Sequence, residues 1–337
     1  MPATVPPAAT TPERTAVPVS FPTPAVVAVS QFRHRIRFRE LHGIVLLDKP
    51  EGLSSNQALQ AARRLFRAAK GGHAGALDPL ATGLLPLCFG EATKLAHGLL
   101  GSRKAYEAEC RLGVTTTTAD REGEVVSRRA VPVLDEAAVE AALAGFRGRI
   151  VQVPPVYSAL KQGGEPLYLK ARRGESVAAP PREVDIYRLE LLERTADSVR
   201  LYVECGSGTY VRSLAADLGE ALGCGAHLAS LRRLWVEPFR APAMVTLDRL
   251  REAAGQGDEG LARWLLPVTE AVAGLPALRL DEAQSLAVAQ GRQIVLAGAG
   301  PVERCAAFAS DGRLLALAAL DESGKLRILR GFNLPPG

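Results

Sequence analysis

Apolar and polar residues alternate with a period of two in several stretches of the chain, which is the pattern of strands that bury one face. The clearest stretch is 198–205, where Val199, Leu201, Val203 and Cys205 fall on one face. We predict further strands at residues 42–50, 105–113, 306–309, 314–317 and 325–330, with the hairpin signal Asp311-Gly312 joining two of them.

Other stretches repeat apolar residues every three or four positions, which predicts amphipathic helices. Leu59, Ala62 and Phe66 follow this spacing after Ser54, and Gln57 completes a Ser-x-x-Gln capping pattern. We expect Gly71 to stop this helix. Further helices are predicted from the cap Asp135 to about Gly145, after the cap Thr246, and from Asp281 to Gln290, with Trp264 buried among helical connectors over residues 240–274.

The chain has 337 residues, which is enough for one large domain and one small one. Residues 1–35 hold many of the prolines and show little periodicity, so we expect a disordered N-terminal extension. Prolines also interrupt its apolar residues, which argues against a secretory signal. The predicted domains are therefore 36–273 and a strand-rich unit, 274–337. No apolar run is long enough to span a membrane.

Charge and cysteine content change this picture only slightly. The formal charge of +5 permits a polyanionic partner, but solubility alone would also account for it. Arginine occupies every second position from 33 to 39, either as a strip of phosphate contacts or as a solvated basic tail. The five cysteines lack metal-type spacing and indicate a reducing compartment. The five histidines form no cluster, so we expect no metal site.

A glycine-rich stretch at residues 71–83 carries the strongest candidate chemistry. Four glycines surround one imidazole, His73, and one carboxylate, Asp78. Pro79 disfavours helical backbone for Asp78, so the acid is expected on an extended or turning loop. Taken alone, Leu-Asp-Pro favours a surface turn in which Asp78 hydrogen-bonds to its own backbone.

Two other segments are candidates to serve the same site. Lys49 ends the first predicted strand, where it either supports a site or lies exposed at a turn. The turn 206–210 leads into a helix, and Arg212 at its start could hold Asp78 ionised through a bidentate pair. We reject a nucleotide-binding loop there, because Val211 stands where that fingerprint has its third glycine.

The string GHAGALDPLATGLLPLCFGEATKL closely resembles the catalytic motif of the TruB family of tRNA pseudouridine synthases. The resemblance covers residues 42–334, and its motifs are dense up to residue 235. It implies that Asp78 is the catalytic carboxylate, that Arg212 is its partner, and that Tyr106 stacks against the target uracil. It further implies substrate-binding roles: Tyr210 and Leu231 line the uracil pocket, His73 occupies the region vacated in the T-loop, and Lys49 supports the site.

The segment 153–174 combines prolines, aromatic residues and basic residues, which fits either an RNA-facing loop or a plain surface loop. It is similar to the family's loop that closes over the tRNA stem-loop. We expect much of the affinity for RNA to come from phosphate contacts by pairs such as Arg172-Arg173 and Arg232-Arg233.

The resemblance implies the pseudouridine synthase α/β (α+β) fold, with a mixed, largely antiparallel sheet, and a small C-terminal β-rich domain of the PUA type. It implies isomerisation of uridine 55 in the T-loop of tRNA, by base flipping and without a cofactor. The expected partner is the T-arm of tRNA. We expect a cytoplasmic monomer that needs no protein partner and no membrane.

Two other functions are compatible with parts of the sequence. A tRNA-binding protein that reshapes the T-arm would keep the basic segments and lose Asp78 or Arg212, yet both are present. A guide-RNA-dependent synthase, as in archaea, is the other alternative. The strings at 76–83 and 157–161 resemble bacterial, stand-alone members instead.

Overall fold

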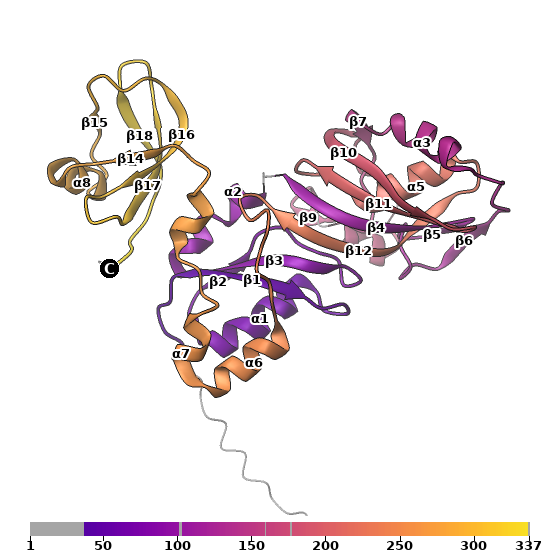
Figure 1. The fold of residues 1–337 in the computed structure, drawn as a ribbon, viewed down its shortest axis with the longest axis horizontal. Coiled ribbons are helices and arrows are strands. Elements are labelled where there is room, and N and C mark those ends of the chain that lie inside the picture. Colours follow the sequence, from indigo (N-terminus) through magenta and orange to yellow (C-terminus); the bar gives the residue numbers. More distant parts are fainter. Residues whose placement is uncertain (1–36, 101–102, 159, 176, 336–337) are drawn as a thin grey trace, which may run out of the picture. The chain divides into compact units, whose positions relative to one another are not determined.

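The structure is a computed structural model that describes residues 37–100, 103–158, 160–175 and 177–335 (Figure 1). The predicted disordered extension at 1–35 lies outside the described residues, as do Arg33 and Arg35, two of the four arginines of the strip at 33–39. Arg39 is described, and it pairs with Asp258 at 2.7 Å. No helix of the described residues is both long enough and apolar enough to cross a membrane.

The larger sheet contains nine strands of the described residues, in the order β13-β1-β3-β12-β4-β11-β10-β7, with β2 also paired to β3. The pairs β1–β13 and β12–β3 are parallel and the other pairs are antiparallel, which confirms the predicted mixed, largely antiparallel sheet. Its strands are β1 (Gly43–Lys49), β2 (Gly71–His73), β3 (Thr82–Phe89), β4 (Lys104–Leu112), β7 (Gly148–Gln152), β10 (Arg182–Arg194), β11 (Ser198–Cys205), β12 (Ala226–Val236) and β13 (Val245–Thr246).

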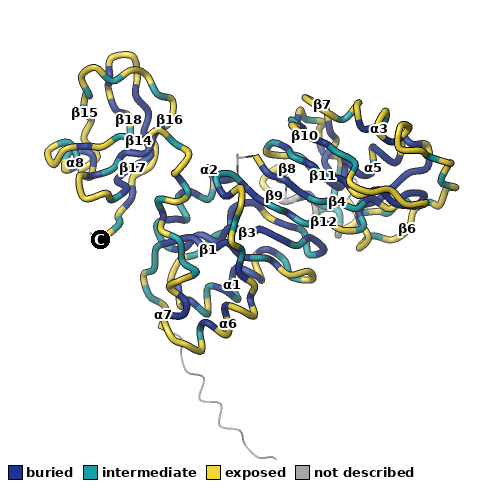
Figure 2. Tube along the Cα trace, in the orientation of Figure 1, coloured by how far each residue is buried: buried dark blue, intermediate teal, exposed yellow. Residues whose placement is uncertain are grey.

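The strands predicted from alternating residues are confirmed. The predicted strand at 198–205 is β11, and the predicted strands at 42–50 and 105–113 contain β1 and most of β4. Strands β1 and β3 are buried almost throughout, because both faces of this part of the sheet are covered (Figure 2). Two hairpins lie outside the sheet: β5 (Val114–Thr116) pairs with β6 (Val125–Arg128), and β8 (Lys161–Gln162) with β9 (Glu165–Pro166).

The helices begin at the predicted caps. Ser54 accepts a hydrogen bond from the Gln57 backbone N–H and the Gln57 side chain accepts one from the Ser54 N–H, so the predicted capping box is confirmed. The helices are α1 (Ser55–Phe66), α2 (Ala96–Leu100), α3 (Glu136–Ala144, capped by Asp135), α4 (Leu167–Arg172), α5 (Val211–Ala221), α6 (Leu247–Gly255, capped by Thr246), α7 (Gly257–Ala262) and α8 (Glu282–Ala289, capped by Asp281), with 3-10 turns η1 (Gly90–Lys94) and η2 (Val268–Val272).

Two local predictions were wrong. Helix α1 ends at Phe66 and not near Gly71, because Arg67 adopts a left-handed conformation (φ 54°) and its N–H bonds to the last carbonyls of the helix. The chain then turns, and Gly71 begins β2. Trp264 is only half-buried, since it packs against the rim of the core instead of within it.

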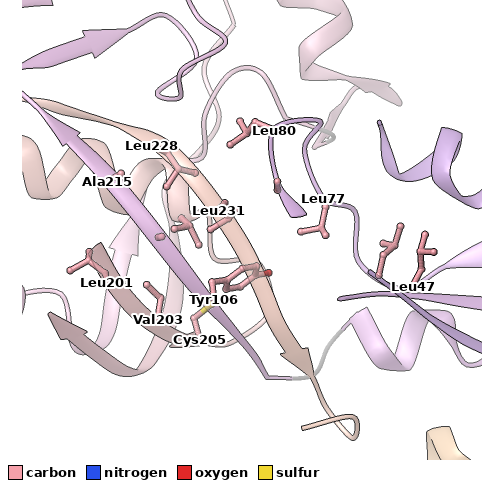
Figure 3. Packing of buried hydrophobic residues seen from close by; sticks show 14 of the residues in the cluster. Leu47, Leu77, Leu80, Tyr106, Leu201, Val203, Cys205, Ala215, Leu228 and Leu231 are labelled. Atoms are coloured by element: carbon pink, nitrogen blue, oxygen red, sulfur yellow. The ribbon is translucent and has the colours of Figure 1, made fainter. Parts of the chain in front are cut away.

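The main hydrophobic core joins α1 and α5 to the sheet and extends to the glycine-rich stretch. Leu77 and Leu80, which flank Asp78, are both buried in this core. Figure 3 shows them packed near Leu228 and Leu231 of β12. The loop that carries Asp78 is therefore anchored by apolar side chains on both sides of the acid.

The C-terminal residues form a second sheet of five strands, in the order β14-β16-β17-β18-β15. Asp311 and Gly312 join β16 to β17, which confirms the predicted hairpin, and all seven residues of β17 are buried. The unit is β-rich, as predicted. Its strands are β14 (Ala277–Arg279), β15 (Ile294–Val295), β16 (Val302–Phe308), β17 (Leu314–Leu320) and β18 (Lys325–Gly331).

Candidate active site

Asp78 lies on the loop between β2 and β3, and the backbone around it is held from several sides. The Ser55 hydroxyl accepts from the Leu77 N–H (2.7 Å) and donates to the Leu77 carbonyl (3.0 Å). The Gly52 N–H donates to the Pro79 carbonyl at 2.8 Å. These bonds leave the Asp78 side chain 44% exposed on a fixed loop. Asp78 therefore does not lie on an isolated surface turn. Hydrogen bonds from Ser55 of α1 and from Gly52, just after β1, hold the backbone on both sides of it.

Arg212 meets Asp78 from the start of α5. Its Nε lies 3.0 Å from the Asp78 Oδ2, and its side chain is only 6% exposed. The remaining guanidinium nitrogens donate to the Tyr157 carbonyl (2.9 Å) and the Thr118 carbonyl (3.2 Å). The structure therefore brings together the two charged residues that the sequence suggested as partners, and it fixes the guanidinium with two further contacts.

A second carboxylate, Asp120, completes this cluster, and the sequence analysis did not single it out. Asp120 is 3% exposed, and its Oδ2 lies 3.4 Å from the Arg212 Nη1. It also accepts from the Thr118 hydroxyl (2.6 Å) and the Glu122 N–H (3.0 Å). Arg212 thus stands between one buried and one half-exposed carboxylate. Asp120 belongs to a polar Thr-rich run whose sequence pattern does not reveal this contact.

The surroundings of Asp78 change its acidity. Desolvation raises the pKa of Asp78 above its ordinary value, and the negative charge of Asp120 raises it further. The positive charges of Arg212 and Lys49 oppose this change. A carboxylate whose charge is held in a partly desolvated cleft by a fixed cation is typical of catalytic sites.

Asp78 faces a cavity of about 310 Å³. Figure 3 shows Tyr106 of β4 beside Leu231 of β12, and both line this cavity. Tyr210 lines it as well; its backbone is held by Gln152, which accepts from the Tyr210 N–H (3.1 Å) and donates to the Tyr210 carbonyl (3.3 Å). Five of the predicted site residues thus share one cavity: Asp78, Tyr106, Tyr210, Arg212 and Leu231.

The cavity also carries an excess of positive charge. Lys104, Arg182, Arg212 and Arg233 line it, against the single carboxylate of Asp78. Burial lowers the pKa of Lys104 to about 8, so its amine still carries a proton at neutral pH for most of the time. This charge distribution favours a ligand that bears phosphate groups.

Two polar atoms of the cavity lack a partner within the protein. Among the described residues, two buried side-chain atoms of cavity-lining residues have neither a hydrogen-bond partner nor an ion-pair partner: Ser158 Oγ and Arg182 Nε. Buried polar groups are normally satisfied, so each of these atoms is a candidate contact for a polar ligand. No group of three histidine, cysteine or acidic side chains in the described part of the chain could hold a metal ion.

Lys49 and His73 do not line the cavity. Lys49 is fully buried, and its Nζ donates to the carbonyls of Pro50 (2.8 Å), Leu53 (2.6 Å) and Pro79 (3.3 Å). Through its bond to the Pro79 carbonyl, Lys49 therefore holds the backbone just after Asp78. His73 is half-buried at the end of β2, and its Nδ1 has no partner among the described residues. Burial, followed by the charge of Arg233, lowers the pKa of His73.

The burial of Lys49 should make stability depend on pH. Desolvation lowers its pKa from 10.5 to about 8, and the charge of Asp78 only partly opposes this. Between these two pKa values the unfolded chain holds the proton more often than the folded chain, so the free energy of unfolding rises with pH. The expected gain across the window is about 3 kcal/mol, from ~1.4 kcal/mol for each pKa unit.

This expectation is tested by urea unfolding of the wild type and of Lys49→Met at both ends of that pH window. The wild type should gain stability relative to the variant as the pH rises, because the variant lacks the group that titrates. Parallel pH profiles for the two proteins would show that Lys49 keeps an ordinary pKa.

One expectation about basic residues was wrong. Arg233 does not contact phosphates from the surface, because it is 1% exposed and its Nε donates to the Leu84 carbonyl (2.6 Å). Arg232 pairs with both oxygens of Asp48 at 3.0 and 2.8 Å. Arg173 is exposed and pairs with Glu165 at 2.5 Å. Alternation along β12 separates the two neighbouring arginines, with one side chain in the core and one outside.

Comparison with known proteins identifies the family of this chain. The TruB family pseudouridylate synthase N-terminal domain matches residues 63–211, and the tRNA pseudouridylate synthase B C-terminal domain matches residues 212–273. A tRNA pseudouridine synthase B of Xanthomonas euvesicatoria is 59% identical over 299 residues, which is 89% of this chain and 96% of the relative. That of Xanthomonas axonopodis is 60% identical with the same coverage.

A solved structure shares the fold. It is described as the crystal structure of the archaeal box H/ACA sRNP Nop10-Cbf5 complex, and it is 26% identical with a TM-score of 0.65. The alignment covers 88% of this chain and 87% of that one. The two family domains match consecutive parts of the chain, and relatives near 60% identity cover most of its length. This chain therefore belongs to the TruB family of pseudouridylate synthases.

Proposed function

We propose that this protein isomerises uridine 55 in the T-loop of tRNA to pseudouridine, in the cytoplasm and without a cofactor. The observation that carries the proposal is the ion pair of 3.0 Å between Asp78 and the buried Arg212, at the wall of a positively charged cavity. The relatives named tRNA pseudouridine synthase B support tRNA as the substrate. The position within the tRNA follows from the resemblance of the motifs to the family.

The cavity is suited to one flipped nucleotide. Its volume of about 310 Å³ lies at the small end of ligand sites, which span roughly 300–1,000 Å³. A base stacked inside an RNA loop must leave its stack to reach Asp78, which costs a few kcal/mol. Stacking on Tyr106 would return about 1–3 kcal/mol of this. Lys104 and Arg182, which also line the cavity, would hold the phosphates on either side of the base.

Each site residue has a proposed role in the isomerisation. The reaction breaks the bond between N1 and C1′ of the uridine and joins C5 to C1′, so nothing is exchanged with a second substrate. Asp78 supplies the reacting carboxylate, and Arg212 keeps it ionised and aimed at the cavity. Leu231 and Tyr106 give the base apolar and aromatic contact while it turns. Their buried positions on neighbouring strands fix the width of the cavity.

The direct test is to incubate the purified protein with an unmodified tRNA transcript and to map pseudouridine. We expect modification at a single uridine of the T-loop. A transcript that stays unmodified, or that is modified outside the T-arm, would refute the proposal.

The alternatives lack comparable support. A protein that only reshapes the T-arm would not need Asp78 and Arg212 to be joined by a fixed ion pair. A guide-RNA-dependent synthase is the class suggested by the archaeal complex, but this chain is only 26% identical to that structure. Its relatives at 59% and 60% identity are named for activity on tRNA.

We expect the chain to act alone on an isolated T-arm hairpin. All five cavity-lining site residues are supplied by this one chain, which supports a stand-alone enzyme. The hairpin should be modified by protein that has been treated with a chelator and a nuclease, with affinity falling steeply as salt rises. A hairpin of the same length with the T-loop sequence scrambled is the control. Activity that returns only after cellular RNA or a metal is added would contradict this prediction.

A further inference from the structure

Arg182 is the first residue of β10 and lies beside the turn that leads into α5. In the sheet register it is opposite Gln152 of β7. Gln152 in turn accepts from the Tyr210 N–H and donates to the Tyr210 carbonyl. Arg182 also lines the cavity, together with the turn residues 206–210. The pairing of β10 with β7 therefore brings an arginine to the part of the cavity wall that Tyr210 and its turn build.

The Arg182 guanidinium contacts this turn in two ways. Its Cζ lies 4.8 Å from the centroid of the Tyr210 ring, which is within the range of a cation–π contact. Its Nη2 donates to the Gly208 carbonyl. Gly208 has a left-handed backbone (φ 86°), and a Cβ there would lie 3.3 Å from the Arg182 Cζ. Glycine thus allows the turn and leaves room for the guanidinium, which holds both the turn and the aromatic ring.

The remaining edge of the guanidinium, its Nε, is buried and has no partner in the described part of the chain. No carboxylate there forms an ion pair with Arg182 either. Buried donors are normally satisfied, and a cation removed from water is most stable beside an anion. An RNA phosphate would supply both the acceptor and the negative charge. The other unpartnered atom of the cavity, Ser158 Oγ, is uncharged and suits a base or sugar oxygen instead.

Arg188, on the same strand, shows what an arginine in a similar setting looks like when the chain completes it. Its Cζ lies 4.9 Å from the centroid of the Tyr202 ring, so it also stacks on a tyrosine. Its Nε, however, donates to the Glu190 carboxylate at 2.6 Å. The chain therefore supplies an anion for the Nε of Arg188, which lies outside the cavity, and none for the Nε of Arg182, which lines it.

We propose that Arg182 couples the RNA backbone to the placement of Tyr210: its Nε edge binds a phosphate next to the target uridine, while its Nη2 and its face hold the turn and the Tyr210 ring. The inference rests on the proposed function of this site. One rigid planar group makes all three contacts, so a phosphate that fixes the guanidinium also fixes Tyr210. Arg182 is thus a binding residue for RNA and a positioning residue for Tyr210.

The phosphate contact is tested with tRNA assembled from synthetic fragments, in which each phosphate that flanks the target uridine is replaced in turn by an uncharged methylphosphonate. Each neutral substrate is compared with one that carries the same stabilising 2′-deoxy sugar and an ordinary phosphate. The wild type should bind one of the neutral substrates at least about tenfold more weakly, because a hydrogen bond to a charged group is lost. Arg182→Gln should already bind the ordinary substrate about tenfold more weakly, and should lose less than about threefold more on the neutral one.

The coupling is tested with Arg182→Lys, which keeps the charge but lacks the planar fork. This variant should bind tRNA within about threefold of the wild type, because an ammonium can still reach a phosphate. Its saturated single-turnover rate should fall at least about tenfold, because one ammonium cannot hold the phosphate and the Gly208 carbonyl while lying across the Tyr210 ring. Arg188→Lys is the matched control and should keep the wild-type rate.

Either of two results would overturn the inference. Arg182→Gln that remains as sensitive to the neutral linkage as the wild type would assign the phosphate to a different group. A normal saturated rate for Arg182→Lys would separate this arginine from the placement of Tyr210. A merely structural arginine would weaken binding of the charged and neutral substrates by the same factor. If Arg182→Gln does not fold, the wild type still decides, because equal affinity for all substrates refutes the contact.

The outcomes also separate this inference from the proposed function. Wild-type protein that forms no pseudouridine in ordinary tRNA refutes the proposed function. Wild-type protein that is active, combined with an Arg182→Gln variant that still responds to the neutral linkage, refutes the role of Arg182 alone. The affinities test the contact between Arg182 and the phosphate whether or not the uridine is converted.

Discussion

Replacing Asp78 by asparagine should abolish pseudouridine formation and leave the affinity for tRNA within about tenfold, or ~1.4 kcal/mol. Asparagine keeps the size of the side chain and its ability to hydrogen-bond, but it removes the charge. The cavity should survive the change, because Arg212 keeps its ion pair with Asp120 and its bonds to two backbone carbonyls. Leu77 and Leu80 continue to anchor the loop.

Single-turnover kinetics and a binding titration on the same transcript measure both quantities. Asp248→Asn is a suitable control, because its side chain is 85% exposed on α6. Substantial turnover by the purified Asp78→Asn protein would remove Asp78 from the catalytic role.

The same carboxylate should determine how the rate of pseudouridine formation falls at acidic pH. We expect the ionised form of Asp78 to be the active one, and the pKa of Asp78 is raised by desolvation and by Asp120. The rate should therefore begin to fall at a higher pH than an ordinary aspartate would allow. Asp120→Asn removes one of the two causes and should move the limb to lower pH.

The sequence was sufficient to predict the elements that position the site. Strand β11, helix α8 and the caps of α1, α3 and α6 depend on local patterns, and the structure confirms them. The long motif around Asp78 is sufficient to identify the loop. Local chemistry decides such features, because a cap or an alternating strand depends on residues a few positions apart.

Burial of charged residues could not be predicted in the same way. Lys49 and Arg233 look like surface residues in the sequence, yet both are almost fully buried. Their partners are backbone carbonyls from distant segments, such as Leu53 and Pro79 for Lys49. Backbone carbonyls carry no sequence signal, so a lysine held by three of them cannot be distinguished from an exposed lysine in the sequence.

Asp120 shows a related limit. It lies 92 residues before Arg212 in the chain, and their contact depends on the turn after β5 meeting the start of α5. A chain with several acidic residues in polar loops offers many candidates for such a partner. Only the packing of the turn against the helix selects this one.

Replacing Arg212 by lysine should collapse the single-turnover rate by at least about 100-fold, or ~2.7 kcal/mol. Lysine keeps the positive charge, but its ammonium is a single point and cannot reproduce the planar fork. In the structure that fork meets Asp78, Asp120 and the carbonyls of Thr118 and Tyr157. An ammonium that stays with the buried Asp120 would leave Asp78 without the ion pair that orients its carboxylate.

The salt dependence of binding distinguishes this role from a contact with phosphate. Loss of a phosphate contact lowers the salt slope of affinity by about one and weakens binding evenly across sequences. Arg212 is 5% exposed and already holds two carboxylates, so the slope of Arg212→Lys should equal that of the wild type. Arg249→Lys on α6 controls for the substitution itself. A reduced slope together with a normal saturated rate would place Arg212 on the RNA backbone, and Asp78 would then need a different partner to stay ionised inside the cavity.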